Sequence, residues 1–430
     1  MVLLRDTAAA GEWLLCPTRM SFVSTSATTP TCEWSVGPAG LEQLAEPWDE
    51  LALATDPRSV FLRNSWARAW AAAHEDLEIR VLALRDRARV VAILPWVAWP
   101  GSLLGLPIRR WVALCGIPTE TTPASRTARW LCRDVRWGWG ATTPLLFAKL
   151  DRPLLVMLGL KESLRSLPAD LLQIQGLGPE IPIVGSSLSH TVTSTAPNWV
   201  AVSGGEQSGR KRLSKRSKKR LATGLAALQA LPGFRFDVTL GSALGDADLD
   251  ELEQLERKST KATAGASILT SGARNRGFLA ALLRHEPSCR VGRLRTADRL
   301  IAWALGMRAS DRGEGFLLAH DPAYDEHYPG LLAYVMVEEA LDQESPLASY
   351  SLGRGEEFWK TGRLLGTAEP RIDLNVYAPN FRGRVLAGLH RRVAAWRTRV
   401  PKQPDPANER AQPNPEEVDL PLSTAPDRAS

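Results

Sequence analysis

The feature that most constrains the fold is a run of three short segments separated only by polar turns. Each segment has the length of a β-strand, and short turns join such strands into an antiparallel meander. A helix and a further strand follow, which predicts a mixed, mostly antiparallel sheet flanked by helices. The strands are predicted at 289–295, 300–308 and 315–320, the helix at 330–342 and the next strand at 347–352.

Apolar spacing predicts more helices and strands on both sides of this meander, which makes the fold class α/β (α+β). Residues 90–108 carry no charge, but prolines at 95, 100 and 107 favour strand–turn–strand over a membrane-spanning helix. No transmembrane span is expected. The other predicted helices are 38–54, 65–74, 246–260, 271–285 and 356–364, and the other predicted strands are 78–85, 89–99, 234–240 and 371–377.

The length of 430 residues favours more than one domain. Residues 191–208 are rich in Ser, Thr and Gly and are interpreted as a junction between two lobes. The end of the chain is proline-rich and acidic without a periodic apolar face, which predicts disorder. The predicted division is 1–32 as a poorly ordered N-terminal segment, 33–196 and 197–400 as two lobes, and 401–430 as a disordered tail.

Composition excludes several classes of protein. The five cysteines are scattered and none forms a C-x-x-C pair, so a disulfide scaffold is not expected and a reducing cytoplasmic location is. The six histidines form no recognisable ligand pattern, so no metal is expected. The net charge of +6 owes much to one cluster, Arg210–Arg220. This cluster is either a solvated first turn of a helix or an anion-contacting surface, and without interleaved aromatic residues it does not predict nucleic-acid binding.

The start of the predicted helix at 330–342 has the composition of a phosphate site. Tyr328-Pro329-Gly330 precedes it, and proline suits the first turn of a helix because its missing N–H would have no partner there. Glycine lets a phosphate approach the unpaired main-chain N–H groups. A second glycine-bearing turn, Gly353-Arg354-Gly355, ends a strand nearby. It lacks the G-K-[ST] ending of a Walker loop, and it is too short for a dinucleotide-binding fingerprint.

Together these residues resemble a known group of proteins. Asp321 and Tyr324 form a D-x-x-Y loop, Pro-Gly follows at 329–330, L-G-x-G stands at 352–355, and a lysine stands at 360. The chain resembles the CelD-like acyltransferases of the GNAT superfamily, which are relatives of the Fem peptidyltransferases built from two GNAT-like lobes. The resemblance spans roughly residues 34–377 and is clearest in the second lobe.

The resemblance implies two tandem GNAT-like lobes and an acyl-CoA cosubstrate bound between the strands at 315–320 and 347–352. The backbone edge of the first strand would pair with the pantetheine amides, and the helix beginning at Gly330 would receive the pyrophosphate. The implied cofactor-binding residues are Leu318, Pro329, Gly330, Leu331, Gly353, Arg354, Gly355 and Lys360. The catalytic candidates, as general base or proton donor, are Asp321, Tyr324, Asp325, Tyr328 and Glu356.

Three hypotheses on function stay open at this point. The first is an N- or O-acyltransferase whose acceptor is a small molecule, a sugar or an envelope or exopolysaccharide component. The second is an aminoacyl-tRNA-dependent ligase of the Fem type, supported by the basic cluster Arg210–Arg220. The third is a non-catalytic GNAT-like binding module. It is favoured by Tyr328 and Ser351, which stand where the resembling proteins usually carry serine and an acidic residue.

Overall fold

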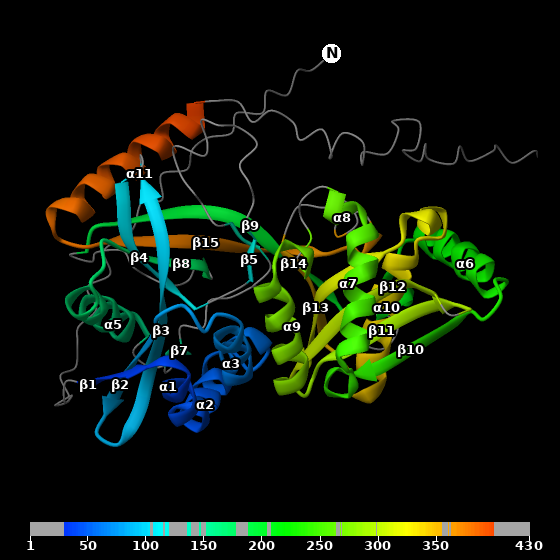
Figure 1. Ribbon diagram of the computed structural model, residues 1–430, viewed down its shortest axis with the longest axis horizontal. Coiled ribbons are helices and arrows are strands. Elements are labelled where there is room, and N and C mark those ends of the chain that lie inside the picture. The colour runs from blue at the N-terminus through cyan, green and yellow to red at the C-terminus, as the bar shows by residue number, and fades with distance from the viewer. Residues whose placement is uncertain are drawn as a thin grey trace, which may run out of the picture.

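A computed structural model shows the fold over most of the chain. One large sheet runs through the whole molecule, and helices cover both of its faces (Figure 1). The described residues are 30–103, 106–114, 117–119, 136–138, 146–147, 152–177, 188–203, 208–263, 267, 269–297, 299–354, 360 and 363–399.

The first half of the chain contributes helices followed by an antiparallel meander. The helices are α1 (Gly37–Gln43), α2 (Ala45–Thr55), α3 (Asn64–Ala73) and α5 (Arg152–Ser166). The sheet strands are β1 (Thr31–Val36), β2 (Ile79–Asp86), β3 (Arg89–Leu103), β4 (Leu106–Ala113), β7 (Leu146–Phe147), β8 (Leu171–Leu177) and β9 (His190–Val202). A separate two-stranded antiparallel sheet consists of β5 (Ile117–Thr119) and β6 (Arg136–Gly138).

The second half repeats this order of elements. The helices are α6 (Lys215–Gln229), α7 (Asp246–Lys258), α8 (Thr260–Thr263), α9 (Ala273–His285), α10 (Pro329–Glu344) and α11 (Phe381–Arg399). The strands are β10 (Arg235–Leu240), β11 (Arg290–Thr296), β12 (Arg299–Ala309), β13 (Arg312–His320), β14 (Ser349–Arg354) and β15 (Thr367–Tyr377).

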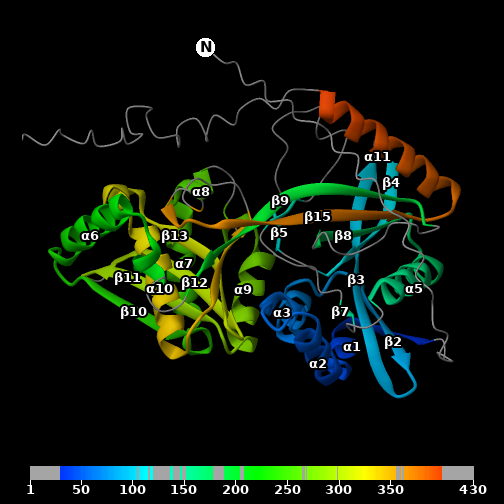
Figure 2. The same ribbon diagram turned by 180° about the vertical axis from the view of Figure 1, so that it is seen from behind.

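The strands of the two halves follow one another in the same relative order when each half is counted from its own edge of the sheet, which reveals two related lobes. That order is β1-β2-β3-β4-β8-β15-β9-β14-β13-β12-β11-β10. In each lobe a helix crosses over between two parallel strands, α5 between β4 and β8 and α10 between β13 and β14. The lobes exchange their last strands, since β9 pairs with β14 and β15 pairs with β8. Figures 1 and 2 show β9 and β15 side by side, linking the two halves.

The exchange of strands is reinforced by a hydrophobic core that both lobes share. Helices α3 and α9 pack against each other between the lobes (Figure 1). Trp66 of α3 contacts Phe278 of α9 with ring centroids 5.0 Å apart and Phe316 of β13 with centroids 5.3 Å apart. Such edge-to-face aromatic contacts add specificity to apolar burial. The two lobes therefore form one packed body.

Most of the predicted elements are confirmed. The mixed, mostly antiparallel α/β architecture, the hairpin of β2 and β3, and the meander of β11, β12 and β13 are all present. The described residues of the uncharged stretch at 90–108 belong to β3 and to the first part of β4, which pair as antiparallel strands. Among the described helices, none has both the length and the apolar composition needed to cross a membrane.

Several boundaries differ from the prediction. The helix predicted at 38–54 is two helices, because the chain breaks helical geometry at Leu44, and the poorly ordered segment ending at 32 overlaps β1. The junction predicted at 191–208 was wrong over most of its length, since β9 reaches Val202 in the middle of the sheet. The lobe boundary at 196/197 lies within β9, and the division into domains stays a prediction. Residues 1–29, 401–430 and most of 356–364 lie outside the described residues.

Candidate active site

The second lobe contains a fork between two parallel strands. β13 and β14 pair only from Arg312 to Glu314, although β13 continues to His320 and β14 to Arg354. Each strand also shifts register against its other neighbour near this point, at Leu305/Gly306 and at Ser351/Gly353. Such bulges bend a strand and turn its edge away from the partner. The gap that the sequence predicted between these strands is therefore present.

Beyond the fork, β13 presents main-chain groups to the open side. The Asp321 N–H donates to the Ile301 carbonyl at 2.8 Å, so alternate residues, among them Leu318, point their peptide groups away from β12. The Leu318 carbonyl is reached from α8 by the Lys261 ammonium, which donates to it at 3.0 Å. The strand edge that could pair with an extended ligand is thus engaged by a lysine side chain.

Tyr334 of α10 fills the base of the fork. A methyl group at Gly315 would lie 1.9 Å from the Tyr334 hydroxyl oxygen, so only glycine lets the ring approach β13 this closely. The hydroxyl donates to the Ser351 carbonyl of β14 at 3.2 Å. Burial raises the pKa of Tyr334 well above its usual value, so this hydroxyl keeps its proton. The side chain touches both strands where they separate and holds the fork apart.

Glu314 stands at the last paired position of the fork and was not among the residues predicted from the sequence. Its side chain is fully buried, and this burial is the main cause that raises its pKa. The nearby Arg312 guanidinium and a hydrogen bond with Ser351 oppose that rise in part. The Arg312 Nε lies 3.0 Å from the carboxylate, close enough for an ion pair although not aligned as a hydrogen bond. A buried carboxyl with a raised pKa at a strand fork is a candidate general base.

A polar network connects Glu314 to the exchanged strands. Arg312 also contacts Glu369 of β15 at 3.2 Å, and Glu369 accepts from Asn198 of β9 at 3.2 Å. The Ser351 hydroxyl donates to Asn198 Oδ1 at 3.3 Å. Glu314 lies opposite Ser351 in the register of β13 and β14, so the network joins the two strands at the last paired position of the fork.

The start of α10 offers main-chain N–H groups beside the fork. Tyr328 precedes the helix in a left-handed conformation with φ 53° and gives no side-chain cap. Pro329 has no N–H, and the Leu332 N–H bonds the Tyr328 carbonyl, so the amides of Gly330 and Leu331 lack acceptors within the helix. Such a pair of amides can receive phosphate oxygens.

This helix start is partly covered by His320. Pro329 and Gly330 are buried, whereas Tyr328 and Leu331 are partly exposed. The His320 Nδ1 would lie 2.7 Å from a methyl group at Gly330, and its Nε2 contacts Asp325 Oδ1 at 2.7 Å. The imidazole ring therefore lies against Gly330 at the start of α10.

The other predicted catalytic residues surround the same helix start. Asp321 caps the short helix 322–327 by accepting from the Ala323 N–H at 3.0 Å, and it is paired with Arg299. The Arg299 guanidinium lies over the Tyr324 ring, 6.0 Å from the ring centroid. The Arg363 guanidinium lies over the Tyr328 ring, 5.0 Å from the ring centroid. Glu356 lies outside the described residues.

The predicted cofactor residues of the glycine turn are less closely assembled. Gly353 has φ +76°, which a side chain rarely adopts, and faces the Gly315 carbonyl across the fork. Arg354 pairs with Asn198 of β9 through the backbone. Lys360 is fully buried, which does not favour a contact with a phosphate at the surface. Gly355 lies outside the described residues. Within the described part of the chain, no cluster of three His, Cys, Asp or Glu side chains is arranged to hold a metal ion.

The chain resembles known proteins in sequence within the second lobe and in fold over most of its length. Residues 215–361 match the family described as an acetyltransferase (GNAT) domain. FemX superposes with a TM-score of 0.54 at 8% identity over 80% of this chain and 98% of FemX. L-PGS from Bacillus licheniformis gives 0.45 at 10% identity over 82% of this chain and 97% of that chain. A tandem GNAT protein from the clavulanic acid biosynthesis pathway gives 0.43 at 12% identity over 81% and 99%.

Residues 215–361 thus match an acetyltransferase (GNAT) domain, and the chain shares the fold of FemX. The family match covers the second lobe, which contains the fork, Glu314 and the start of α10. Among curated proteins, no sequence matches the chain.

Proposed function

We propose that the second lobe transfers an acyl group from acyl-CoA to an amine or hydroxyl of a small-molecule, sugar or envelope or exopolysaccharide acceptor. The observation that carries this proposal is the fork, since β13 and β14 separate beyond Glu314 beside two unpaired amides of α10. The family match over residues 215–361 supports it. We also propose that the chain is related most closely in function to the CelD-like acyltransferases, which its sequence resembles.

The residues around the fork fit an extended thioester with a diphosphate. The amides of Gly330 and Leu331 would receive phosphate oxygens, with the Arg363 guanidinium nearby over the Tyr328 ring. The open edge of β13 at Leu318 would pair with amide groups of the ligand. Bound acyl-CoA supplies the activated acyl group.

Glu314 is proposed as the general base, ahead of the carboxylates predicted from the sequence. It takes the proton from the acceptor as the acceptor nitrogen or oxygen bonds to the acyl carbon. The carbon–sulfur bond breaks, and the departing sulfur is protonated, with the Tyr328 hydroxyl as the candidate donor. Asp321 caps the short helix 322–327 beyond the fork and Asp325 is exposed there, which makes them weaker candidates.

Replacing Gly330 with leucine tests the phosphate site. Even a methyl group here would lie 2.7 Å from His320 Nδ1, so the leucine has to push the imidazole ring aside and crowd the start of α10. We therefore expect affinity for acetyl-CoA to fall at least about tenfold, or about 1.4 kcal/mol. His320 is partly exposed and can turn away, so the fold should survive. Titration calorimetry measures the affinity and circular dichroism the fold. Gly388→Leu on α11, where no heavy atom lies within 4 Å, is the matched control. Unchanged binding by Gly330→Leu would remove the diphosphate from this helix.

Replacing Lys261 with methionine tests the open edge of β13. The Lys261 ammonium now occupies the Leu318 carbonyl, and methionine cannot donate to it. Because one hydrogen bond contributes about 1 kcal/mol, we expect acetyl-CoA to bind about fivefold more tightly. The exposed Lys258→Met on α7 is the control and should bind as the wild type does. Weaker binding by Lys261→Met would instead mean that the ammonium contacts the coenzyme.

The Fem-type alternative differs in its donor. An aminoacyl-tRNA donor would be retained through the exposed basic residues of α6, and its binding would weaken steeply as salt rises. A chain that binds aminoacyl-tRNA but no thioester would support this alternative. A chain that binds neither would support the non-catalytic binding module.

A further inference from the structure

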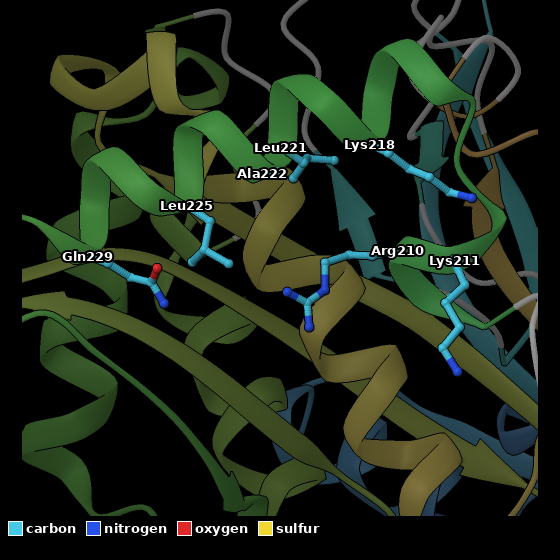
Figure 3. Close-up of a pocket in the computed structure, with 7 residues that line it drawn as sticks. All are labelled: Arg210, Lys211, Lys218, Leu221, Ala222, Leu225 and Gln229. Atoms are coloured by element: carbon cyan, nitrogen blue, oxygen red, sulfur yellow. The ribbon is translucent and has the colours of Figure 1, made fainter.

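A groove lies beside α6, away from the fork. It has a volume of about 600 Å³, and its residues come from one side of α6 and from the short helix at Gly209–Arg212 (Figure 3). Figure 3 shows the α6 side chains following the helix on one side, with Arg210 and Lys211 across from them. The lining residues are Arg210, Lys211, Lys218, Leu221, Ala222, Leu225 and Gln229.

One wall of the groove is fixed by buried charges. Glu338 of α10 has no exposed surface and pairs with Arg212, while accepting from Ser203 at 2.9 Å and from the Gly209 N–H at 3.1 Å. Breaking such a buried pair is costly, so this attachment is rigid. Glu339 accepts from the Arg210 N–H at 2.8 Å and from its guanidinium Nε at 3.0 Å. The wall of the groove at Arg210 is therefore held in place by α10.

The rim of the groove is positively charged. The sequence of α6, KRSKKRLATGLAALQ, contains no acidic residue. Lys211 and Lys218 are exposed and form no ion pair with any described residue, whereas the charge of Arg210 is balanced by Glu339. Two ammonium groups that no described carboxylate neutralises attract an anion.

The floor of the groove is apolar. Leu221 is buried, Leu225 is half-buried and Ala222 is exposed, and all three line it. No lining residue is aromatic, so the groove has no platform on which a nucleobase could stack. A free phosphate would use the lysines but not the leucines. The two features together fit a ligand with an anionic head and an apolar chain.

From these contacts we infer that the groove binds an acidic phospholipid, with the head group at Lys211 and Lys218 and the first part of the chain along Leu221, Ala222 and Leu225. This site is separate from the proposed acyl-CoA site, because α6 meets the segment before α10 through Gly224, on another side of the helix. Its ligand brings the protein to an anionic membrane surface. The inference does not depend on acyl transfer.

Cosedimentation of the full chain with vesicles tests the inference. We expect binding to vesicles of equal parts phosphatidylglycerol and phosphatidylcholine and none to pure phosphatidylcholine. Since each lysine near an anionic surface contributes roughly a fivefold gain in affinity, Lys211→Ala with Lys218→Ala should weaken binding about 25-fold. The exposed Lys258→Ala should have no such effect.

A second pair of variants separates the groove from general charge attraction. Ala222→Trp fills the groove at an exposed position and should weaken vesicle binding at least tenfold, with acetyl-CoA binding unchanged. Thr223→Trp is equally exposed on a neighbouring side of α6 and should bind vesicles as the wild type does. Wild-type binding by Ala222→Trp would overturn the inference. So would displacement of the vesicles by equimolar inorganic phosphate, or preferential binding to single-stranded RNA that Ala222→Trp does not affect.

Discussion

Glutamine in place of Glu314 is expected to lower kcat by about 10²- to 10⁴-fold, the usual contribution of a general base. The substitution keeps the size of the side chain and its ability to bond Ser351, and it removes only the capacity to accept a proton. Arg312 retains Glu369 as its partner, so the network at the fork stays connected. The rate is measured as release of thiol from acetyl-CoA in the presence of an acceptor that the wild-type protein uses.

The pH dependence of kcat/KM distinguishes a general base at Glu314 from a carboxyl with only a structural role. Burial raises the pKa of Glu314, and a base acts only after losing its proton, so wild-type kcat/KM should rise with pH through a midpoint above the ordinary range for glutamate. The Glu314→Gln variant should lack this acid limb. The exposed Glu326→Gln serves as the control and should keep both rate and limb. A Glu314→Gln enzyme with wild-type kcat would remove Glu314 from the reaction.

The raised pKa of Glu314 also predicts how stability depends on pH. Activity should rise with pH, whereas the contribution of this carboxyl to stability should fall. A carboxyl whose pKa is higher in the folded state binds its proton more tightly there, so its contribution is fully present at low pH and is lost as the pH rises through the folded value. Glutamine is neutral throughout. Thermal unfolding should therefore favour Glu314→Gln over the wild type increasingly as the pH rises, whereas a loss of stability at every pH would indicate a purely structural role.

Local patterns in the sequence predicted the elements whose contacts are close in the chain. The meander of β11, β12 and β13 follows from short polar turns between segments of strand length, and the gap between β13 and β14 followed from the resemblance. Glu314 was missed because the third strand of the meander was predicted to begin at residue 315, which left residue 314 in the turn before it. The alternation of Arg312 and Glu314 with Gly313 and Gly315 was a signal that β13 begins earlier.

Long-range pairing decided the features that were not predicted. Residues 191–208 are rich in Ser, Thr and Gly, which indicates a loop by composition, but β9 is held in the sheet by pairing with both β14 and β15. Helix α11 was not predicted, and its apolar residues Leu386 and Ala387 become buried in a cluster with Tyr377 and with Leu171, which comes from a distant part of the chain. Similarly, the covering of Gly330 by His320 depends on packing between β13 and α10.

Truncating Trp66 to alanine is expected to destabilise both lobes together, by about 3–5 kcal/mol. This side chain comes from the first lobe, is 1% exposed, and packs against Phe278 and Phe316 of the second lobe. Because the core is shared, urea unfolding should remain a single transition that shifts to lower concentration. The exposed Leu53→Ala on α2 should change stability by less than about 0.5 kcal/mol.

The Trp66 substitution also tests what the first lobe contributes to the site, although it has no extended fork of its own. In the first lobe β4 ends at Ala113, directly after its last pair with β8 at Val112, so among the described residues it has no long free edge like that of β13. Phe316 stands in the register shift of β13, two residues beyond Glu314, and Trp66 supports it from the first lobe. We therefore expect acyl transfer per folded molecule to fall in Trp66→Ala, because the bulge that opens the fork loses its support. Two separate unfolding transitions, or full activity of the folded fraction, would mean that the lobes act independently.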